Sequence, residues 1–558
     1  MRIRAFSHFI EDHARPHQLK NCSLVIDAQN FFYEFYKDIG LHCEFGAECD
    51  KYAKYLKNYL TMFKKANIKC YFIFKGGTKG LEKKITKVIN YLDRGQNKFI
   101  NPIFMIDIHV QVLKEMEFDY FFSEYESKPD CMTLARKVSC PVLSNDIEFP
   151  LSGVQYIPKN SLGNYNGDHI SCKLFRQNII LQKFRLNMNK LALFILLTDE
   201  TIFPENSFHK LFRLKRFPPS PMRRYIALFN WLSKLLEELN KVKKVVRGEV
   251  NSEVAFDYFF NKCKITDWFV SGVATNTIAK EYVDLYRSNV LFKEINGDDA
   301  FTEPLLDIIK YAYDLLTAFN NDGLKFIRYY YDLETDKSVI ITRSINKPSF
   351  QSDEPIFKNG WHNIVSFGLF QHFIAETINF DCDKLEKIPD DAKMLMITLV
   401  YIFHISKSQP NVIMFTSEMA YGVLLSYVIL GVVQERADGI QSDNLITKSD
   451  CESALNSLHD YFDVKDPNQI MNKNLFKPLK QFQLSLLQMN YLNKLCGSPF
   501  EPTSYMKTYN GTFVYKIIYI MKSKGIIPSI NEALSSAPTV LKYFHNIIEL
   551  YKNLIQSD

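Results

Sequence analysis

The sequence predicts an α/β N-terminal domain with a central, mostly parallel sheet, followed by a mostly α-helical C-terminal region. Two observations support this prediction. Short apolar runs recur over the first part of the chain, as in SLVIDA, YFIF, PVLSND and LALFILLTDE, and such runs between polar segments are typical of buried parallel strands. Further along, the apolar positions follow long helical patterns, as in PLLDIIKYAYDLLTAF and AKMLMITLVYIFHIS.

Length and composition indicate folded material throughout. The 558 residues are enough for two or three domains, and the chain is 47% hydrophobic and 14% aromatic. No repeat or low-complexity tract is evident. We expect an α/β domain over 1–200, a basic helical extension over 201–245 and a helical region over 246–558.

The cysteines and apolar segments favour an intracellular protein. The 11 cysteines contain no CxxC pair, so neither a zinc module nor a disulfide framework is indicated. The N-terminus, MRIRAFSHFIEDH, has charges where a signal peptide needs an apolar core. Residues 412–433 are apolar but interrupted by Glu418 and other polar residues, which predicts one or two buried helices rather than a membrane span.

The stretch 121–150, FFSEYESKPDCMTLARKVSCPVLSNDIEFP, is unusually acidic for a segment bounded by apolar runs. Its clustered carboxylates are Glu124, Glu126, Asp130, Asp146 and Glu148. Carboxylates held close together repel and raise one another's pKa, so a buried group of this kind needs cations. The alternative is a solvated helix start followed by an acidic turn.

Three apolar runs end in an acid, and this recurrence favours the buried group. Asp27 closes SLVIDA, Asp146 follows PVLSN, and Asp199 with Glu200 closes LALFILLTDE. Ligands of open α/β sheets bind beyond the carboxyl ends of the strands. With Glu124 and Glu126 leading into a helix, these acids predict a carboxylate bowl for hard divalent cations, which prefer oxygen ligands.

Basic residues are concentrated in two blocks although the net charge is only +6. Residues 51–100 contain thirteen Lys/Arg against two acids, and 201–250 contain eleven against four. In the first block, apolar and basic positions alternate with helical spacing, which predicts a helix with a cationic face. A phosphate backbone is the natural partner of such a face; the alternative is a solvated lysine-rich surface. The residues expected to bind nucleic acid are Lys79, Lys83, Lys84, Lys87, Arg94, Lys215, Arg216, Arg223 and Arg224.

The order of several blocks carries a family resemblance. MRIRAFSHFIEDH, VIDAQNFFYEFY, YFIFKGG, FSEYESKPDCMTLA, CPVLSNDIEF, LLTDE and LFNWLS follow one another over roughly residues 1–240. This order resembles the asteroid branch of the flap-endonuclease and XPG-type structure-specific nucleases. The resemblance implies a PIN-like fold for residues 1–200 and metal-dependent cleavage of DNA flaps, overhangs or single strands.

The resemblance also implies a set of catalytic, metal-binding acids. These are Asp27, Glu124, Glu126, Asp146, Glu148 and Asp199. In the family such acids hold two Mg²⁺ ions that activate a water and stabilise the leaving oxygen of a phosphodiester. We therefore expect one or two Mg²⁺ ions, or Mn²⁺, as cofactor, DNA rather than RNA as partner, and a nuclear location.

Several positions depart from the family pattern. Lys75 stands in FIFKGG where an Asp is usual, and we expect its ammonium at the mouth of the bowl, near Asp27. Glu148 stands where Asp is usual, and Arg2 and Ala5 replace two glycines. Two extra residues separate Glu126 from the CMTLA helix. These departures put catalysis in question.

The C-terminal half contains no catalytic motif that we recognise. FIRYYYDLE and KSVIITRSI predict a hairpin within an otherwise helical region. This region is expected to cover the α/β domain or to bind a protein partner. Three functions stay open from the sequence: a Mg²⁺-dependent endonuclease, a catalytically silent nucleic-acid-binding adaptor, and a PIN-like RNA regulator. We expect no membrane association.

Overall fold

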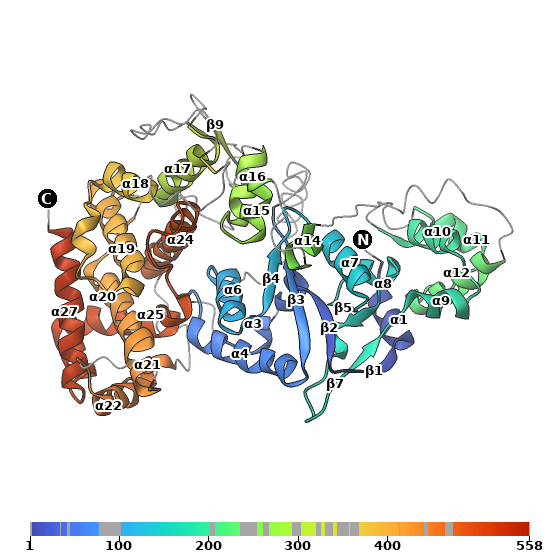
Figure 1. Cartoon of the computed structure of the whole chain (residues 1–558), viewed down its shortest axis with the longest axis horizontal. Helices are drawn as coiled ribbons and strands as arrows, with labels where there is room; N and C mark the ends of the chain where they lie inside the picture. Colours follow the sequence, from blue (N-terminus) through green and yellow to red (C-terminus); the bar gives the residue numbers. More distant parts are fainter. Residues whose placement is uncertain are drawn as a thin grey trace. The chain divides into compact units, whose positions relative to one another are not determined.

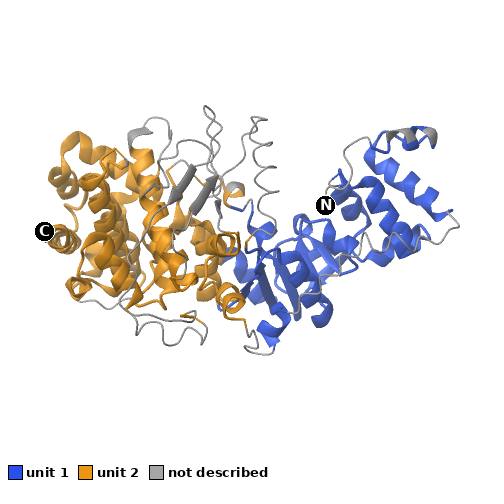
Figure 2. Cartoon of the chain, turned by 90° about the horizontal axis from the view of Figure 1, so that it is seen from above, with its two compact units in different colours: residues 1–35, 58–76, 117–266 blue, residues 36–57, 77–116, 267–558 orange. Residues whose placement is uncertain are grey.

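The computed structural model divides into two compact units (Figure 2). Unit 1 comprises residues 1–35, 58–76 and 117–266, and unit 2 comprises 36–57, 77–116 and 267–558. The structure describes residues 3–33, 35–41, 45–77, 102–200, 207–234, 254–260, 267–288, 290–292, 303–319, 325–329, 339–342, 356–357, 368–411, 413–439, 445–463 and 473–556. The units follow contacts rather than chain order, and the boundaries expected near residues 200 and 245 stay predictions.

A five-stranded parallel sheet forms the centre of unit 1 (Figure 1), in the order β4-β3-β2-β5-β6. The strands are β2 (Cys22–Asp27), β3 (Ile68–Phe74), β4 (Asp119–Phe122), β5 (Val142–Ser144) and β6 (Tyr156–Pro158). The expected mostly parallel sheet is therefore confirmed. Its strands are apolar almost throughout because helices and connecting segments cover both faces, which leaves no solvated side for alternating polar residues.

The strand register brings the carboxyl ends of the central strands to one edge. Asp27, the last residue of β2, pairs with Ile73 near the end of β3. On the other side of β2, Ile26 pairs with Leu143, one residue before the end of β5. Residues that directly follow these strands therefore gather at the same edge of the sheet.

The helices α2 (Ala28–Phe32), α7 (Ser127–Val138) and α14 (Val254–Phe260) pack on the sheet. The second half of α4 (Cys49–Lys65) also belongs to this unit. Aromatic side chains make several of these contacts. Phe31 of α2 lies 6.1 Å from Phe72 of β3 between ring centroids, and Phe259 of α14 lies 5.0 Å from Tyr71. Helix α7 packs against β2, so its first turn lies beside the carboxyl end of that strand.

Smaller elements complete this part of unit 1. Strands β1 (Arg15–Leu19) and β7 (Ile170–Leu174) form a separate antiparallel pair. The short helix α8 (Glu148–Leu151) follows β5, and a 3₁₀ turn, η1 (Lys159–Ser161), follows β6. Helix α8 begins only four residues after β5 ends, which keeps Asp146 and Glu148 close to the sheet edge.

A group of helices forms the rest of unit 1. It consists of α1 (Phe6–His13), α9 (Gln177–Lys183), α10 (Met188–Thr198), α11 (His209–Leu214) and α12 (Pro221–Ser233). Its core is aromatic: Phe194 of α10 lies 4.3 Å from Phe229 of α12, and Phe6 of α1 lies 5.3 Å from Phe194.

One strand prediction is wrong. The run LALFILLTDE forms helix α10 rather than a strand, so Asp199 follows a helix. The helix has 11 residues, about three turns, and Asn187 caps its start by accepting a hydrogen bond from the Lys190 amide at 2.9 Å. A capped apolar run of this length forms a buried helix more readily than a strand.

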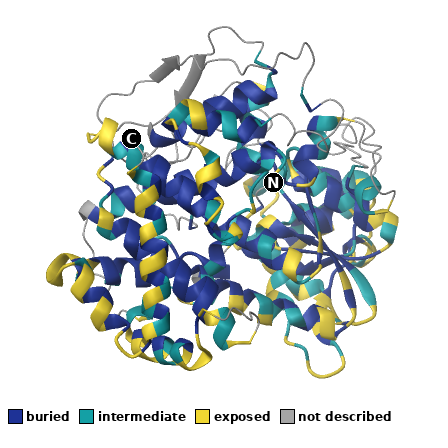
Figure 3. Ribbon diagram, turned by 60° about the vertical axis from the view of Figure 1, so that its left-hand side comes forward, coloured by how far each residue is buried: buried dark blue, intermediate teal, exposed yellow. Residues whose placement is uncertain are grey.

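Unit 2 is mostly helical within the described residues, as expected (Figure 1). Its helices are α3 (Phe35–Asp38), α6 (Met105–Glu115), α15 (Trp268–Ala274), α16 (Lys280–Ser288), α17 (Leu306–Leu316), α18 (Leu369–Ile378), α19 (Asp390–Ser408), α20 (Ser417–Tyr427), α21 (Gln434–Ala437), α22 (Lys448–Leu458), α24 (Lys473–Leu495), α25 (Gly511–Lys524), α26 (Ile526–Ala533) and α27 (Pro538–Ile555). Figure 3 shows the inner helices as largely buried. The expected hairpin strands pair antiparallel as β9 (Lys325–Tyr329) and β10 (Val339–Thr342), and β8 (Val290–Phe292) pairs with β9 in parallel.

The most apolar helix of unit 2 is a core helix. Ser417–Ala437 is long and apolar enough to cross a membrane, but 78% of its most apolar window is buried inside the protein. A π-helical segment, Val428–Val433, lies within it. The prediction of buried helix for this apolar stretch is confirmed.

Candidate functional site

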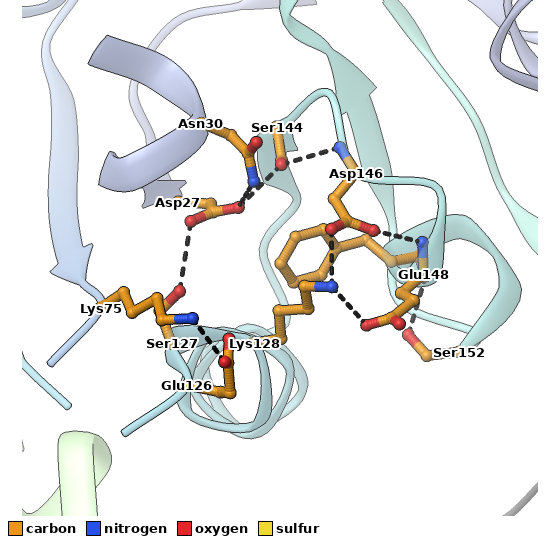
Figure 4. A network of polar contacts seen from close by, with 11 residues as sticks. Asp27, Asn30, Lys75, Glu126, Ser127, Lys128, Ser144, Asp146, Glu148 and Ser152 are labelled. Carbon is orange, nitrogen blue, oxygen red and sulfur yellow. Dashed lines mark hydrogen bonds and ion pairs between the residues drawn. The ribbon is translucent and has the colours of Figure 1, made fainter. Parts of the chain in front are cut away.

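The candidate site lies at the carboxyl edge of the sheet in unit 1 (Figure 4). Asp27 ends β2, Ser144 ends β5, and Lys75 directly follows β3. Glu126 is the N-cap residue of α7, which places Lys128 in the first turn of that helix. Parallel strands present their carboxyl ends at one edge, and the register of this sheet brings these residues together.

Asp27 is the most deeply buried acid of the group, with 1% of its surface exposed. Its Oδ2 accepts hydrogen bonds from Asn30 Nδ2 at 2.5 Å and Ser144 Oγ at 2.9 Å, and its Oδ1 accepts one from Ser127 Oγ at 3.3 Å. Burial raises the pKa of the Asp27 carboxyl; the hydrogen bonds from Asn30 and Ser144 oppose this shift, and the charge of Asp146 adds to it. Neutral donors therefore satisfy much of this carboxylate.

Asp146 and Glu148 share one cation, Lys128. The Lys128 Nζ lies 2.7 Å from Asp146 Oδ2 and 2.7 Å from Glu148 Oε2. The three side chains of Lys128, Asp146 and Glu148 are 25%, 19% and 28% exposed, respectively, so the ion pairs are partly shielded from water. The Glu148 backbone amide donates to Asp146 Oδ1 at 2.9 Å, which fixes the orientation of the Asp146 carboxylate.

The interaction of Lys128 with its two acidic neighbours shifts pKa values in this cluster. Burial lowers the pKa of Lys128, but the Asp146 and Glu148 carboxylates outweigh burial and raise it overall. Burial likewise raises the pKa of Glu148, but the Lys128 ammonium reverses the shift and lowers it. Both shifts favour the charged forms of Lys128 and Glu148.

The second lysine pairs with a different acid from the one expected. Lys75 Nζ lies 2.5 Å from Glu126 Oε1. The reason is the strand order, because Lys75 follows β3, whose other neighbour is β4, and Glu126 lies just beyond β4. Lys75 thus pairs with another of the predicted acids, and its proximity to Asp27 stays a prediction. Burial raises the pKa of Asp27, and the charge of Lys128 opposes this shift slightly.

Gly76 allows this pairing by letting two backbone segments approach closely. Its amide donates to the Tyr125 carbonyl at 2.9 Å. A Cβ atom at this position would lie 2.0 Å from the Ser123 carbonyl oxygen, far inside contact distance. Only glycine fits here without a shift of the backbone, and the close approach brings Lys75 and Glu126 together.

The other predicted acids have different surroundings. Asp130, 5% exposed, accepts a hydrogen bond from Ser123 Oγ at 2.6 Å inside unit 1. Glu124 is half-buried, and its carbonyl lies against Gly76. Asp199, 4% exposed, ends α10 in the aromatic helix group. Roles for Glu124 and Asp199 beside Asp27 stay predictions.

The residues at the sheet edge do not fit a pair of resident divalent ions in this arrangement. Within the described part of the chain, no group of three or more His, Cys, Asp or Glu side chains is arranged to hold a metal ion. Lysine ammonium groups lie against Glu126, Asp146 and Glu148. The predicted carboxylate bowl is therefore not formed as a coordination sphere, and the metal-binding role of its acids stays a prediction.

Lys128 is the residue that the sequence interpretation missed. In the sequence it looks like one more charged residue at a helix start. A usable signal was present, because cations are disfavoured in the first turn of a helix, where the macrodipole is positive. A lysine in that position beside an acidic segment indicates that an anion lies close by.

The predicted nucleic-acid-binding residues divide into three groups. Lys79, Lys83, Lys84, Lys87 and Arg94 lie outside the described residues. Lys215, Arg216 and Arg223 are exposed around α11 and α12, as a phosphate-binding surface requires. Arg224 instead donates to the carbonyls of Pro218 and Pro219, at 3.1 and 2.7 Å, and so holds the turn before α12.

Two family models match the chain. The asteroid N-terminal domain matches residues 391–558, and the XPG N-terminal domain matches residues 1–91. The chain is therefore similar to the asteroid family and to the XPG-type nucleases over these two regions. The asteroid match lies in the helical region of unit 2, beyond the residues that carry the sequence resemblance, so the two halves of the chain contribute separate similarities.

Curated relatives show the same similarity. The human protein named single-strand DNA endonuclease ASTE1 is 26% identical over 316 residues, which are 49% of this chain and 46% of that protein. The protein asteroid of Drosophila melanogaster is 27% identical over 172 residues, 28% of this chain and 20% of that protein. The matched region is thus less than half the length of either relative.

A solved structure gives a weaker likeness. The catalytic core of Rad2 in complex with DNA substrate is 14% identical, with a TM-score of 0.31 over 45% of this chain and 88% of that chain. A likeness of this size carries no argument, so the fold assignment of this chain depends on its own strand order and helices.

Proposed function

We propose that this chain is a DNA structure-specific nuclease that acts on flaps, overhangs or single strands at the acidic sheet edge. The observation that supports it best is the meeting of Asp27, Asp146, Glu148 and Glu126, from three separate segments, around the carboxyl ends of parallel strands. Similarity to a human protein named single-strand DNA endonuclease ASTE1 supports it too.

The proposed division of labour within the chain follows from charge. Lys215, Arg216 and Arg223 are exposed cations, and such residues attract phosphates and release counterions. The sheet edge provides the carboxylates that the branch uses for hydrolysis, with Mg²⁺ or Mn²⁺ as proposed cofactor. We assign no hydrolytic step to a metal ion, because lysines contact three of these carboxylates in the described arrangement.

A second candidate function is DNA binding without cleavage, which one observation favours. Lys128 lies between Asp146 and Glu148, where its positive charge opposes a divalent ion. If Lys128 stays paired with these two carboxylates when DNA is bound, the chain binds DNA but does not hydrolyse it. A protein partner for the helical region and a nuclear location are further proposals that accompany either function.

The experiment is a combined binding and cleavage assay on the full chain. Labelled flaps, overhangs, single strands, duplex DNA and matched RNA are incubated with Mg²⁺, with Mn²⁺ or with EDTA. Asp146→Asn is the test variant, and Lys20→Gln is the matched control. Lys20 belongs to the same unit, but its partner, Asp168, is 65% exposed and at a different place in the fold.

The nuclease proposal predicts cleavage of branched or single-stranded DNA that requires a divalent ion. Asp146→Asn should lose this cleavage and keep DNA binding, while Lys20→Gln behaves as wild type. Binding without cleavage by wild type supports the second candidate. Preferential cleavage or binding of RNA contradicts both DNA proposals and supports the RNA regulator that the sequence left open.

A further inference from the structure

The charges at the sheet edge already balance in part without any metal. Four carboxylates, those of Asp27, Glu126, Asp146 and Glu148, and two ammonium groups, those of Lys75 and Lys128, lie at this edge (Figure 4). Lys128 contacts Asp146 and Glu148, and Lys75 forms a separate pair with Glu126. Two divalent ions would be enough to neutralise these four carboxylates without the lysines. If both lysines were also present, the site would carry an excess of positive charge.

The position of Lys128 is unfavourable except for its contacts with the two acids. It lies in the first turn of α7, at the positive end of the helix dipole. Three quarters of its side chain is also removed from water, which disfavours an isolated charge. Asp146 and Glu148, each at 2.7 Å, are the groups that offset both effects.

The lysine also occupies the space that an ion bridging the same oxygens would need. Mg²⁺ binds carboxylate oxygens at about 2.0–2.1 Å with strict octahedral geometry. An ammonium at 2.7 Å from Asp146 Oδ2 and Glu148 Oε2 leaves no room for such an ion between them. Lysine and ion therefore compete for one pair of carboxylates.

The neighbouring acid does not relieve this competition. Asp27 accepts hydrogen bonds from Asn30, Ser127 and Ser144, so neutral donors already surround it. Asp146 is further fixed because its amide donates to Ser144 Oγ at 3.0 Å. The network that holds Asp27 in place thus also holds Asp146 toward Lys128.

We propose that Lys128 is the built-in cation of this site. It takes the place of a divalent ion between Asp146 and Glu148, so the folded, DNA-free chain binds no divalent ion at these two carboxylates. This inference concerns the resting protein and is independent of whether the chain cleaves DNA.

The test measures Mn²⁺ binding and thermal stability of the full chain without DNA. Isothermal titration with Mn²⁺ gives the number of bound ions, and thermal unfolding is recorded with millimolar Mn²⁺ and with EDTA. The variants are Lys128→Glu, which places a further acid beside Asp146, and Lys128→Gln, which only removes the charge. Lys20→Glu is the control, because it makes the same charge change in unit 1 away from the network.

For wild type and Lys20→Glu we expect no saturable Mn²⁺ binding and the same melting temperature in Mn²⁺ and EDTA. Lys128→Glu should gain saturable binding and melt ~5 °C higher in Mn²⁺ than in EDTA. If Lys128→Glu fails to fold, Lys128→Gln decides the matter, and it should gain weaker binding of the same kind.

Two results would overturn the proposal. The first is saturable Mn²⁺ binding by wild type that Asp146→Asn abolishes, because the lysine then does not exclude the ion. The second is a folded Lys128→Glu, or in its absence a folded Lys128→Gln, that binds no more Mn²⁺ than wild type. In that case the carboxylates lack the geometry for an ion whatever residue occupies position 128.

Discussion

The charges of Lys128 and Asp146 should interact strongly, and the double-mutant cycle of Lys128→Met and Asp146→Asn measures this interaction. At 2.7 Å two unit charges attract by about 1.5 kcal/mol in water and about 6 kcal/mol at an effective dielectric near 20. Desolvation of side chains that are 25% and 19% exposed removes much of this attraction, so we expect a coupling energy of about 2 kcal/mol.

The assay is hydrogen exchange of the β2 and β5 amides in the full chain. Exchange reports the free energy of local opening at the strands that carry Asp27 and Ser144, and it does not require the whole chain to unfold in one step. The matched cycle is Lys20→Met with Asp168→Asn, an ion pair whose side chains are 44% and 65% exposed. Exposed pairs contribute little, so the coupling should be clearly smaller there.

The reasoning is refuted if the coupling of Lys128 with Asp146 is no larger than that of Lys20 with Asp168. Such a result would mean that water screens both pairs equally. Lys128 would then be a solvated lysine at a helix start rather than the cation of the acidic edge.

Three further predictions concern other parts of unit 1. The pKa of Asp27 is raised in the fold, so its contribution to stability is full below the unfolded pKa near 4 and is lost as pH rises through the folded pKa. Asp27→Asn should therefore become more stable relative to wild type as pH rises from about 4 to about 8. A stability difference, measured by thermal unfolding, that stays constant or falls over this range contradicts the prediction. Gly76→Ala should lower the free energy of unfolding, measured by urea titration, by about 2–3 kcal/mol because the new Cβ meets the Ser123 carbonyl. In Gly40→Ala no atom lies within 4 Å of the new Cβ, so this change should lower the free energy of unfolding by less. Charge reversal at Lys215, Arg216 and Arg223 should reduce the salt dependence of DNA binding by about one unit of slope for each phosphate that these side chains no longer neutralise. Arg224→Gln should instead lower stability with little change in this slope. Equal slopes for the triple variant and wild type in anisotropy titrations would show that these three residues do not bind the DNA backbone.

The strands of the sheet edge were predictable because their apolar runs are short and end at polar residues. Asp27 and Asp146 follow buried runs, and the rule that parallel strands share a carboxyl edge brings them together without further information. The helix after Glu126 was predictable for a similar reason, since its polar start precedes an apolar pattern. The strands themselves and the family resemblance therefore came from local patterns.

Pairing between side chains was not predictable in the same way. Lys75 was expected near Asp27, but its partner depends on β4 lying next to β3, which the sequence does not state. Lys128 gave no signal beyond its unfavourable position at a helix start. Asp199 was misplaced because an apolar run of seven residues, 191–197, suits a buried strand and a buried helix alike, and a single capping residue, Asn187, favoured the helix.

The central claim, that a lysine occupies the acidic edge, is tested most directly by crystallography of the DNA-free wild-type chain grown in Mn²⁺. Anomalous scattering locates manganese independently of the interpretation of side chains. We predict no anomalous peak between Asp146 and Glu148, with the Lys128 Nζ in contact with both carboxylates. A manganese peak between these two residues, with Lys128 turned away, would contradict the account.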